Sequence, residues 1–142
     1  MIDVKFKKLS SSAVTPTYAK DGDAGLDLVS TKLINNTSAQ IEYGTDIAIE
    51  IPRGYVGLLF PRSSVRKYDI ILSNCVGVID SGYRGEIKLT FNKTNDLDSF
   101  TYPIGVKIGQ LIILPLPLVN LLEVDVLSDS DRGEGGFGHT GN

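Results

Sequence analysis

Residues 85–91 read Gly-Glu-Ile-Lys-Leu-Thr-Phe, so apolar and polar side chains alternate along the stretch. Ile87, Leu89 and Phe91 fall on one face, and this period of two is typical of a strand with one buried and one solvated face. Residues 45–51, Thr-Asp-Ile-Ala-Ile-Glu-Ile, repeat the pattern with three isoleucines on one face. The two stretches predict β-sheet.

The rest of the chain continues this pattern in short pieces. Gly (15 residues) and Pro (6 residues) interrupt the apolar runs, and no 11-residue window has a convincing helical period. At most a short helical turn is predicted after Ser63. Many short strands separated by turn residues predict an all-β barrel or jelly roll. Further strands are expected at Val4–Leu9, Gly25–Val29, Tyr55–Phe60, Ile70–Leu72, Phe100–Tyr102, Ile108–Leu114 and Leu122–Val126.

Length, charge and cysteine content exclude several classes of protein. The 142 residues suffice for one domain, and the net charge of −3 argues against duplex nucleic-acid binding through a broad basic surface. No apolar run approaches the roughly 18 residues of a membrane helix, and the N-terminus lacks the apolar core of a signal peptide. Cys75 is the one cysteine, so no internal disulfide is possible. We expect a cytoplasmic protein with no nucleic-acid or membrane partner.

Two segments near the C-terminus differ from barrel strands. Residues 112–119 are very apolar but contain two prolines, which cannot donate to a central ladder. A contact with a partner subunit and a strand buried within the monomer explain this segment equally well. Residues 128–142 are rich in glycine and lack periodicity, which predicts a mobile tail. We therefore divide the chain into a barrel domain, residues 1–127, and a flexible arm, residues 128–142.

The tail also contains residues suited to a nucleotide. Glycine lets backbone N–H groups approach an anion, Arg132 offers a fork of donors for phosphate, and Phe137 offers a stacking face for a base. One interpretation is an arm that folds over a nucleotide. The alternative is a frayed terminus, which composition alone favours.

Three further places in the chain carry polar groups beside apolar strands. Residues 62–64, Arg-Ser-Ser, form either a phosphate cradle or a turn with an exposed arginine. Asp80 begins the turn Asp-Ser-Gly of a predicted β-hairpin over residues 74–85, as a turn former or as a general base at a dry hairpin mouth. Asp27 lies between two leucines and is either a solvated strand residue or a functional carboxylate. One histidine, His139, and one cysteine rule out a Cys/His zinc site, a zinc deaminase and a well-fixed Ser-His-Asp triad.

Taken together and in this order, five segments resemble the five motifs of the trimeric dUTPase family. They extend over nearly the whole chain, at residues 24–28, 61–64, 77–85, 105–112 and 132–141. The resemblance implies a distorted jelly roll that assembles as a homotrimer, with a swapped glycine-rich C-terminal arm that closes each interface site. It implies hydrolysis of dUTP to dUMP and pyrophosphate, with Mg²⁺ bridging the triphosphate largely through water on the protein side.

The resemblance also implies roles for single residues. Asp80 matches the carboxylate that orients and deprotonates the attacking water, and Asp27 matches the aspartate that supports the metal through water. The implied phosphate contacts are Arg62, Ser63, Ser64, Gln110 and, in the arm, Arg132. The implied base and sugar contacts are Asn74, the backbone of Val78, Ile79 and Asp80, then Tyr83, Lys88 and the stacking Phe137. Tyr83 matches the aromatic residue that leaves no space for a 2′-hydroxyl.

Some positions depart from the family's pattern, and two other functions stay open. Val106-Lys107 stand where Asp-Arg is common, Gly109 where alanine is common, and His139 where serine is usual. A dCTP deaminase of similar fold carries a catalytic glutamate on the strand after the hairpin, where this chain has Thr90. A non-catalytic nucleotide-sensing trimer is the alternative from another class, and the full set of polar motif residues argues against it.

Overall fold

Strand β4 (Gln40–Glu50) organises the first of two antiparallel sheets because it pairs with three other strands. One edge of β4 pairs with β3 (Lys32–Asn36) along its first half and with β1 (Lys5–Lys8) along its second half. The other edge pairs with β8 (Glu86–Lys93), which in turn pairs with β6 (Ile70–Leu72). With 11 residues, β4 is the longest of the described strands, and β1 lies at an edge of this sheet.

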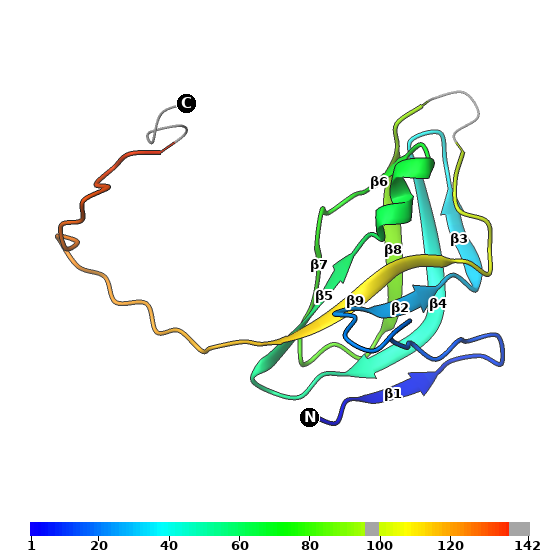
Figure 1. Cartoon of the computed structure of the whole chain (residues 1–142), viewed down its shortest axis with the longest axis horizontal. Coiled ribbons are helices and arrows are strands. Elements are labelled where there is room, and N and C mark those ends of the chain that lie inside the picture. Colours follow the sequence, from blue (N-terminus) through cyan, green and yellow to red (C-terminus); the bar gives the residue numbers. More distant parts are fainter. Residues whose placement is uncertain (96–99, 137–142) are drawn as a thin grey trace.

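The second sheet is built on β9 (Lys107–Pro115). The computed structural model describes residues 1–95 and 100–136, and Figure 1 shows β9 crossing the front of the barrel. The strand order is β2 (Leu26–Val29), β9, β5 (Tyr55–Phe60) and β7 (Gly77–Ile79). The predicted helical turn is confirmed as η1 (Ser63–Lys67), a 3-10 helix, and no helix in the described part is long and apolar enough to cross a membrane.

The apolar core contains side chains from both sheets. Ile87, Leu89 and Phe91 are at most 1% exposed, which confirms the alternation predicted for residues 85–91. Residues of the second sheet, among them Leu28 and Leu111, belong to the same buried cluster. The all-β, jelly-roll-like prediction is therefore confirmed.

One solvated face was expected for residues 45–51, and this expectation is wrong. Strand β4 is buried on both faces from Tyr43 to Ile49. The register between β4 and β8 shifts between Gly44 and Ala48, and Asp46 inside this bulge has a positive φ of 52°. The bulge turns Asp46 toward the loops before β2 and β3, whose side chains cover it.

Two predicted strands are absent from the described residues, and one observed strand was not predicted. Residues 100–102 form a loop in which Phe100 N–H donates to the Asp69 carboxylate (2.9 Å) and Asp69 N–H donates to the Phe100 carbonyl (2.8 Å). These two hydrogen bonds hold the loop at residues 100–102 in place of strand pairing. Strand β3 was missed because every one of its residues is exposed, so backbone pairing with β4 defines it without any apolar pattern.

The chain leaves the barrel after Pro115, and Figure 1 shows residues 116–136 extending away from both sheets. The strand expected at Leu122–Val126 is therefore wrong, since those residues have no strand to pair with in the described chain. Leu118 and Val119 are 93% and 79% exposed, so burial within the monomer is wrong for the second half of the apolar segment. The boundary between residues 127 and 128 stays a prediction.

The turn at residues 80–82 is confirmed, but the hairpin is not. Tyr83 N–H donates to the Asp80 carbonyl at 3.0 Å, as in a β-turn. Strand β7, however, pairs with β5 in the second sheet, whereas β8 pairs with β4 and β6 in the first. The turn is a corner that passes from one sheet to the other, because the chain must close the barrel at this point.

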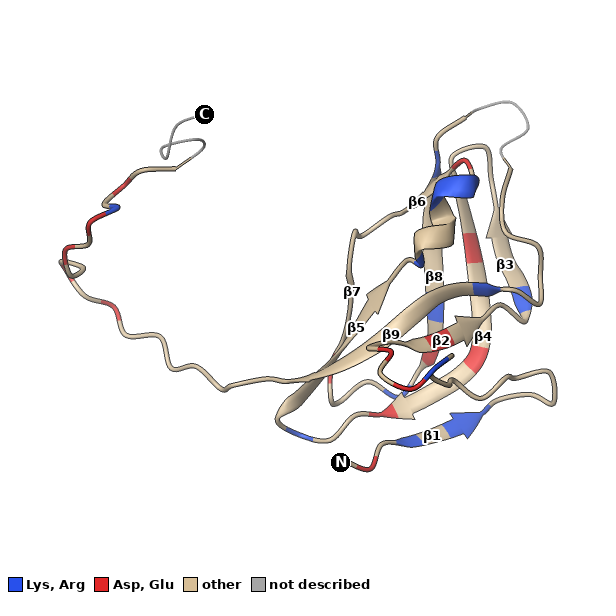
Figure 2. Ribbon diagram, viewed as in Figure 1, with Lys and Arg blue, Asp and Glu red and all other residues tan. Residues whose placement is uncertain are grey.

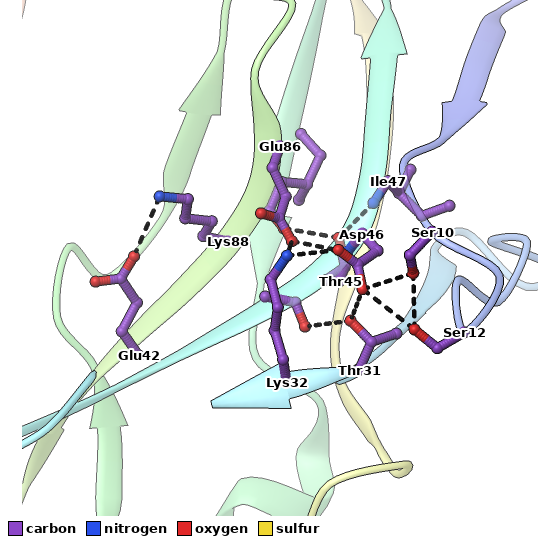
Figure 3. A network of polar contacts seen from close by, with 12 residues as sticks. Ser10, Ser12, Thr31, Lys32, Glu42, Thr45, Asp46, Ile47, Glu86 and Lys88 are labelled. Carbon is purple, nitrogen blue, oxygen red and sulfur yellow. Dashed lines mark hydrogen bonds and ion pairs between the residues drawn. The ribbon is translucent and has the colours of Figure 1, made fainter. Parts of the chain in front are cut away.

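Asp46 is held by polar groups from three segments (Figure 3). Its carboxylate forms an ion pair with Lys32 and accepts hydrogen bonds from Thr31 (2.8 Å) and Ser10 (2.9 Å). The Lys32 contact, followed by the Thr31 hydroxyl, lowers the pKa of Asp46 to about 2. A carboxylate whose pKa falls on folding stabilises the fold above its unfolded pKa, and this contribution is lost as the pH falls through the folded pKa.

We predict that Asp46→Asn lowers the melting temperature at pH 7 by about 5 °C, since a few charged hydrogen bonds are lost while asparagine still tolerates the positive φ. Melting curves of the parent and the variant should converge as the pH is lowered from about 5 to about 2. Glu50→Gln, which breaks an exposed pair with Lys5, is the matched control and should change little. A difference between parent and Asp46→Asn that persists at pH 2 would contradict the assigned origin of this stability.

Candidate functional site

The first group of candidate side chains lies where β2, β9 and β5 meet. Gln110 of β9 sits opposite Asp27 of β2 on one side and opposite Phe60 of β5 on the other. The segment that follows β5 begins with Pro61 and Arg62, so this register brings three separate sequence motifs together.

Asp27 is the centre of this first group. Its side chain is 7% exposed, with Oδ1 2.8 Å from Nε of Arg62 and Oδ2 2.6 Å from Nζ of Lys107. Oδ2 makes no hydrogen bond of good geometry within the described residues, so Lys107 balances its charge without satisfying it fully. The interpretation of Asp27 as a solvated strand residue is wrong, because this carboxylate is buried between two cations.

Two glycines make room for the side chains around Gln110. Gln110 Nε2 donates to the Pro61 carbonyl at 3.2 Å, and a Cβ on Gly25 would lie 2.4 Å from Gln110 Oε1. A Cβ on Gly109 would lie 2.4 Å from Cδ2 of Leu89, so the departure from alanine at this position matches the packing of that leucine. The glycines therefore fix how closely β9 approaches its neighbours.

Ser63 and Ser64 begin η1 directly after Arg62. Ser63 is exposed, whereas Ser64 is half-buried and faces the hydroxyl of Tyr102. That hydroxyl is buried without a hydrogen bond of good geometry in the described chain, and burial raises the pKa of Tyr102. Figure 2 shows that η1 ends in basic residues, so positive charge is concentrated on this side of β5.

The second group of candidate residues surrounds β7 and the corner after it. A pocket of about 230 Å³ is lined by Val78, Ile79, Asp80, Tyr83, Glu86 and Lys88. A neighbouring pocket of about 260 Å³ has Asn74, Lys88 and Thr90 in its lining. Because Lys88 borders both pockets, the pocket of Asn74 and the pocket of Asp80 meet at this residue of β8.

Tyr83 is fixed at the wall of the first of these pockets. Its hydroxyl donates to the Glu86 carbonyl at 3.0 Å, and a Cβ on Gly85 would lie 2.4 Å from the hydroxyl oxygen. Gly85 is therefore needed for the ring to lie here. The β-turn from Asp80 to Tyr83 holds the carboxylate and the ring on the same corner.

Asp80 and Arg62 lie at opposite ends of β5. Ile79 pairs with Gly57, so Asp80 is next to the start of β5, whereas Arg62 follows its end. At about 3.3 Å per strand residue, the four steps from Val56 to Phe60 alone span roughly 13 Å. Within one chain, the Asp80 corner and Arg62 are therefore separated by most of the length of β5.

The remaining predicted residues lie on the arm. Arg132 Nε donates to the carbonyl of Gly135 at 2.7 Å, a contact within the arm itself. Phe137 and His139 fall outside the described residues. In residues 1–95 and 100–136, no three His, Cys, Asp or Glu side chains cluster closely enough to hold a metal ion.

Comparison with known proteins identifies the family. The dUTPase family model matches residues 11–141. The chain belongs to the dUTPase family. It is 40% identical to the deoxyuridine 5′-triphosphate nucleotidohydrolase of Crocosphaera subtropica, with 99% of each chain covered, and 42% identical to that of Clostridium tetani, with 97% and 96% covered. Among solved structures, a Staphylococcus bacteriophage 80alpha dUTPase with dUpNHpp is 28% identical and covers both chains fully, with a TM-score of 0.86.

Two residues, one inside a dUTPase motif and one next to a motif, were not identified from the sequence as site residues. Lys107 was noted only as a departure from the family's pattern, yet it contacts Asp27 directly. Glu86 was assigned only to the solvated face of its strand, yet it lines the Asp80 pocket. Its spacing of two from Lys88, a candidate residue on the same face, was the available signal.

We predict that Asp27→Asn destabilises the protein by about 1–3 kcal/mol, because it leaves Arg62 and Lys107 beside a neutral amide. Urea unfolding at pH 7 measures the change. Asp23→Asn, on the exposed loop before β2, is the control and should stay within about 0.5 kcal/mol. Equal unfolding midpoints for Asp27→Asn and the parent would contradict the described role of the ion pairs.

Proposed function

We propose that the chain hydrolyses dUTP to dUMP and pyrophosphate by attack of water on the α-phosphate. The observation that carries this proposal is Asp80 at the rim of a pocket walled by Tyr83 and Lys88. A carboxylate near pH 7 accepts a proton from an aligned water and needs no covalent intermediate. The relatives named as deoxyuridine 5′-triphosphate nucleotidohydrolases support the same reaction.

The Asp27 group provides the phosphate contacts in this proposal. Arg62 uses Nε to hold Asp27, which directs its two terminal amino groups toward a ligand. Ser63, Ser64 and Gln110 add hydroxyl and amide donors on the same side of β5. Arg132 of the arm supplies a further guanidinium for the terminal phosphate, and Phe137 stacks on the base.

The β7 corner provides the selection of base and sugar. Backbone groups of Val78, Ile79 and Asp80, together with Asn74, hydrogen-bond the uracil edge, and Lys88 lies between their two pockets. Mismatched buried hydrogen bonds reject cytosine strongly, whereas an added methyl group is rejected by only about 1–3 kcal/mol. The Tyr83 ring, anchored at its hydroxyl, fills the space that a 2′-hydroxyl would take.

Mg²⁺ fits this site as an ion held mainly by the substrate. Magnesium keeps several waters and commonly joins one or two carboxylates to substrate phosphates. Asp27 is the carboxylate of the residue group proposed to contact the phosphates. Its Oδ2 makes no hydrogen bond of good geometry within the described residues. Asp27 would hold the hydrated ion through water, and the bound ion would supply neutralisation of the triphosphate charge. A phage phi11 dUTPase with a similar fold contains a structural Mg(II) ion.

A homotrimer completes the site. One chain holds Asp80 and Arg62 at opposite ends of β5, so a second copy is needed to bring both to one nucleotide. The arm gives independent support, because Leu118, Leu121 and Val126 are more than 80% exposed and need a partner surface. The open edge of β1 and the apolar groove beside it offer that surface on another copy.

Two alternative functions are less well supported. A dCTP deaminase needs a carboxylate where this chain has Thr90, and the residues lining that pocket include none. A nucleotide-sensing trimer without catalysis has no need of a carboxylate at the rim of the Asp80 pocket. In the cell, we place the reaction in the cytoplasm, where it keeps uracil out of DNA and supplies dUMP for dTTP synthesis.

The test is pyrophosphate release from dUTP, dTTP, dCTP and UTP, each with and without Mg²⁺. We expect release from dUTP alone, strongly stimulated by the metal, and a loss of about 10²–10⁴-fold in kcat for Asp80→Asn with dUTP binding and assembly retained. Ser81→Ala, on the same turn, is the matched control. Ammonia from dCTP would establish the deaminase instead, and parental turnover in Asp80→Asn would reject the general base.

We also predict that deleting residues 130–142 weakens dUTP hydrolysis without unfolding the barrel, since the described part of this segment, residues 130–136, lies beyond both sheets. Closure over the nucleotide excludes water and completes the site, so kcat/KM should fall by at least about tenfold. Circular dichroism and gel filtration report whether the barrel and its assembly survive. Unchanged steady-state kinetics in the truncated protein would contradict a closing arm.

A further inference from the structure

Glu86 links the Asp46 bulge to the Asp80 pocket. Its Oε1 accepts the N–H of Asp46 at 2.8 Å and lies 3.1 Å from Nζ of Lys32 (Figure 3). The same residue lines the pocket with Asp80, and its carbonyl accepts the Tyr83 hydroxyl. Glu86 therefore belongs both to the polar network and to the lining of the Asp80 pocket.

The reach of Lys32 to this carboxylate depends on a missing side chain. Gly44 is the register partner of Lys32 on β4, and a Cβ there would lie 2.6 Å from both Cε of Lys32 and Oε1 of Glu86. The lysine stem crosses β4 over Gly44 and ends between the carboxylates of Asp46 and Glu86. A chain with any other residue at position 44 loses this bridge or shifts it.

The ion pair between Lys32 and Asp46 stays charged near neutral pH. Hydrogen bonds to Asp46 and Glu86 raise the pKa of Lys32, and the pKa of Asp46 is lowered to about 2. Lys88, which lies two residues after Glu86 on β8, is paired with Glu42 at 3.6 Å. The titratable and charged residues that contact Glu86 or share its pocket are Lys32, Asp46, Asp80, Tyr83 and Lys88. Lys5, Lys7, Glu50 and Arg84 lie around Ala48, the register partner of Glu86 on β4.

We propose that Lys32 is a positioning residue for the Asp80 pocket, acting by neutralising Glu86 and holding its carboxylate against β4. This role for Lys32 rests on the proposed function, in which Asp80 is the general base. Without Lys32, the Asp46 N–H is the one contact left to the Glu86 carboxylate among the described residues, and Glu86 adds an unbalanced negative charge beside the pocket. Like charges disfavour ionisation of a carboxylate and repel a triphosphate.

The experiment compares the pH dependence of kcat for dUTP in the parent, Lys32→Met and Lys32→Met/Glu86→Gln. In Lys32→Met the acidic limb of kcat should move up by about one pH unit, and KM for dUTP should rise several-fold. The double variant has no free carboxylate at position 86, so its limb should return to within about 0.3 of the parent value. Lys32→Gln makes the same change of charge and serves if Lys32→Met does not fold.

Two controls separate this effect from loss of stability. Lys32→Arg keeps the positive charge beside Glu86, so it should leave the limb near its parental position. Thr31→Val removes a hydrogen bond to Asp46 without changing any charge, so it should lower the melting temperature and leave the limb in place. A limb that stays unshifted in Lys32→Met, or that shifts equally in Thr31→Val, would overturn the positioning role while dUTP turnover by the parent still supports the proposed function. A parent without dUTP turnover would overturn both.

Discussion

The burial of Asp27 between Arg62 and Lys107 is the contact on which the arrangement of the first group of candidate residues depends. A buried carboxylate is costly unless cations balance it, and here the two cations come from the segment after β5 and from β9. A slip of one residue in any of the three strands would turn a partner to the opposite face. The ion pairs of Asp27 therefore require the observed register of the second sheet, and they also stabilise that register.

The same sheet separates two groups of candidate residues within one chain. Strand β5 leads into Arg62 at its end, while the β7 corner with Asp80 lies beside its start. In the proposed function, assembly of copies brings the two groups to one nucleotide. The exposed apolar residues after Pro115 are the contact area that this proposal assigns to the assembly.

The sequence predicted the strands whose burial follows a period of two, and it missed or misplaced those defined by other forces. Residues 85–91 alternate in the structure as they do in the sequence, whereas β3 is exposed throughout and has no pattern to detect. Turn chemistry located the Asp80 corner but did not reveal which sheet β7 joins, because pairing partners depend on barrel closure. The motif residues were found one by one, but the Asp27 ion pairs were not, since Lys107 carries no signal until the register is known.

The unusual backbone conformation of Asp46 helps to position Glu86 on the neighbouring strand. A residue other than glycine at positive φ is uncommon, and aspartate is tolerated there because its short side chain bonds locally. In this chain those bonds come from Lys32 and Thr31, and the freed backbone N–H of the bulge is taken by Glu86. The bulge thus fixes the carboxylate of Glu86, a residue that also lines the Asp80 pocket. A contact that holds β4 in its bulged conformation therefore also holds one wall residue of that pocket.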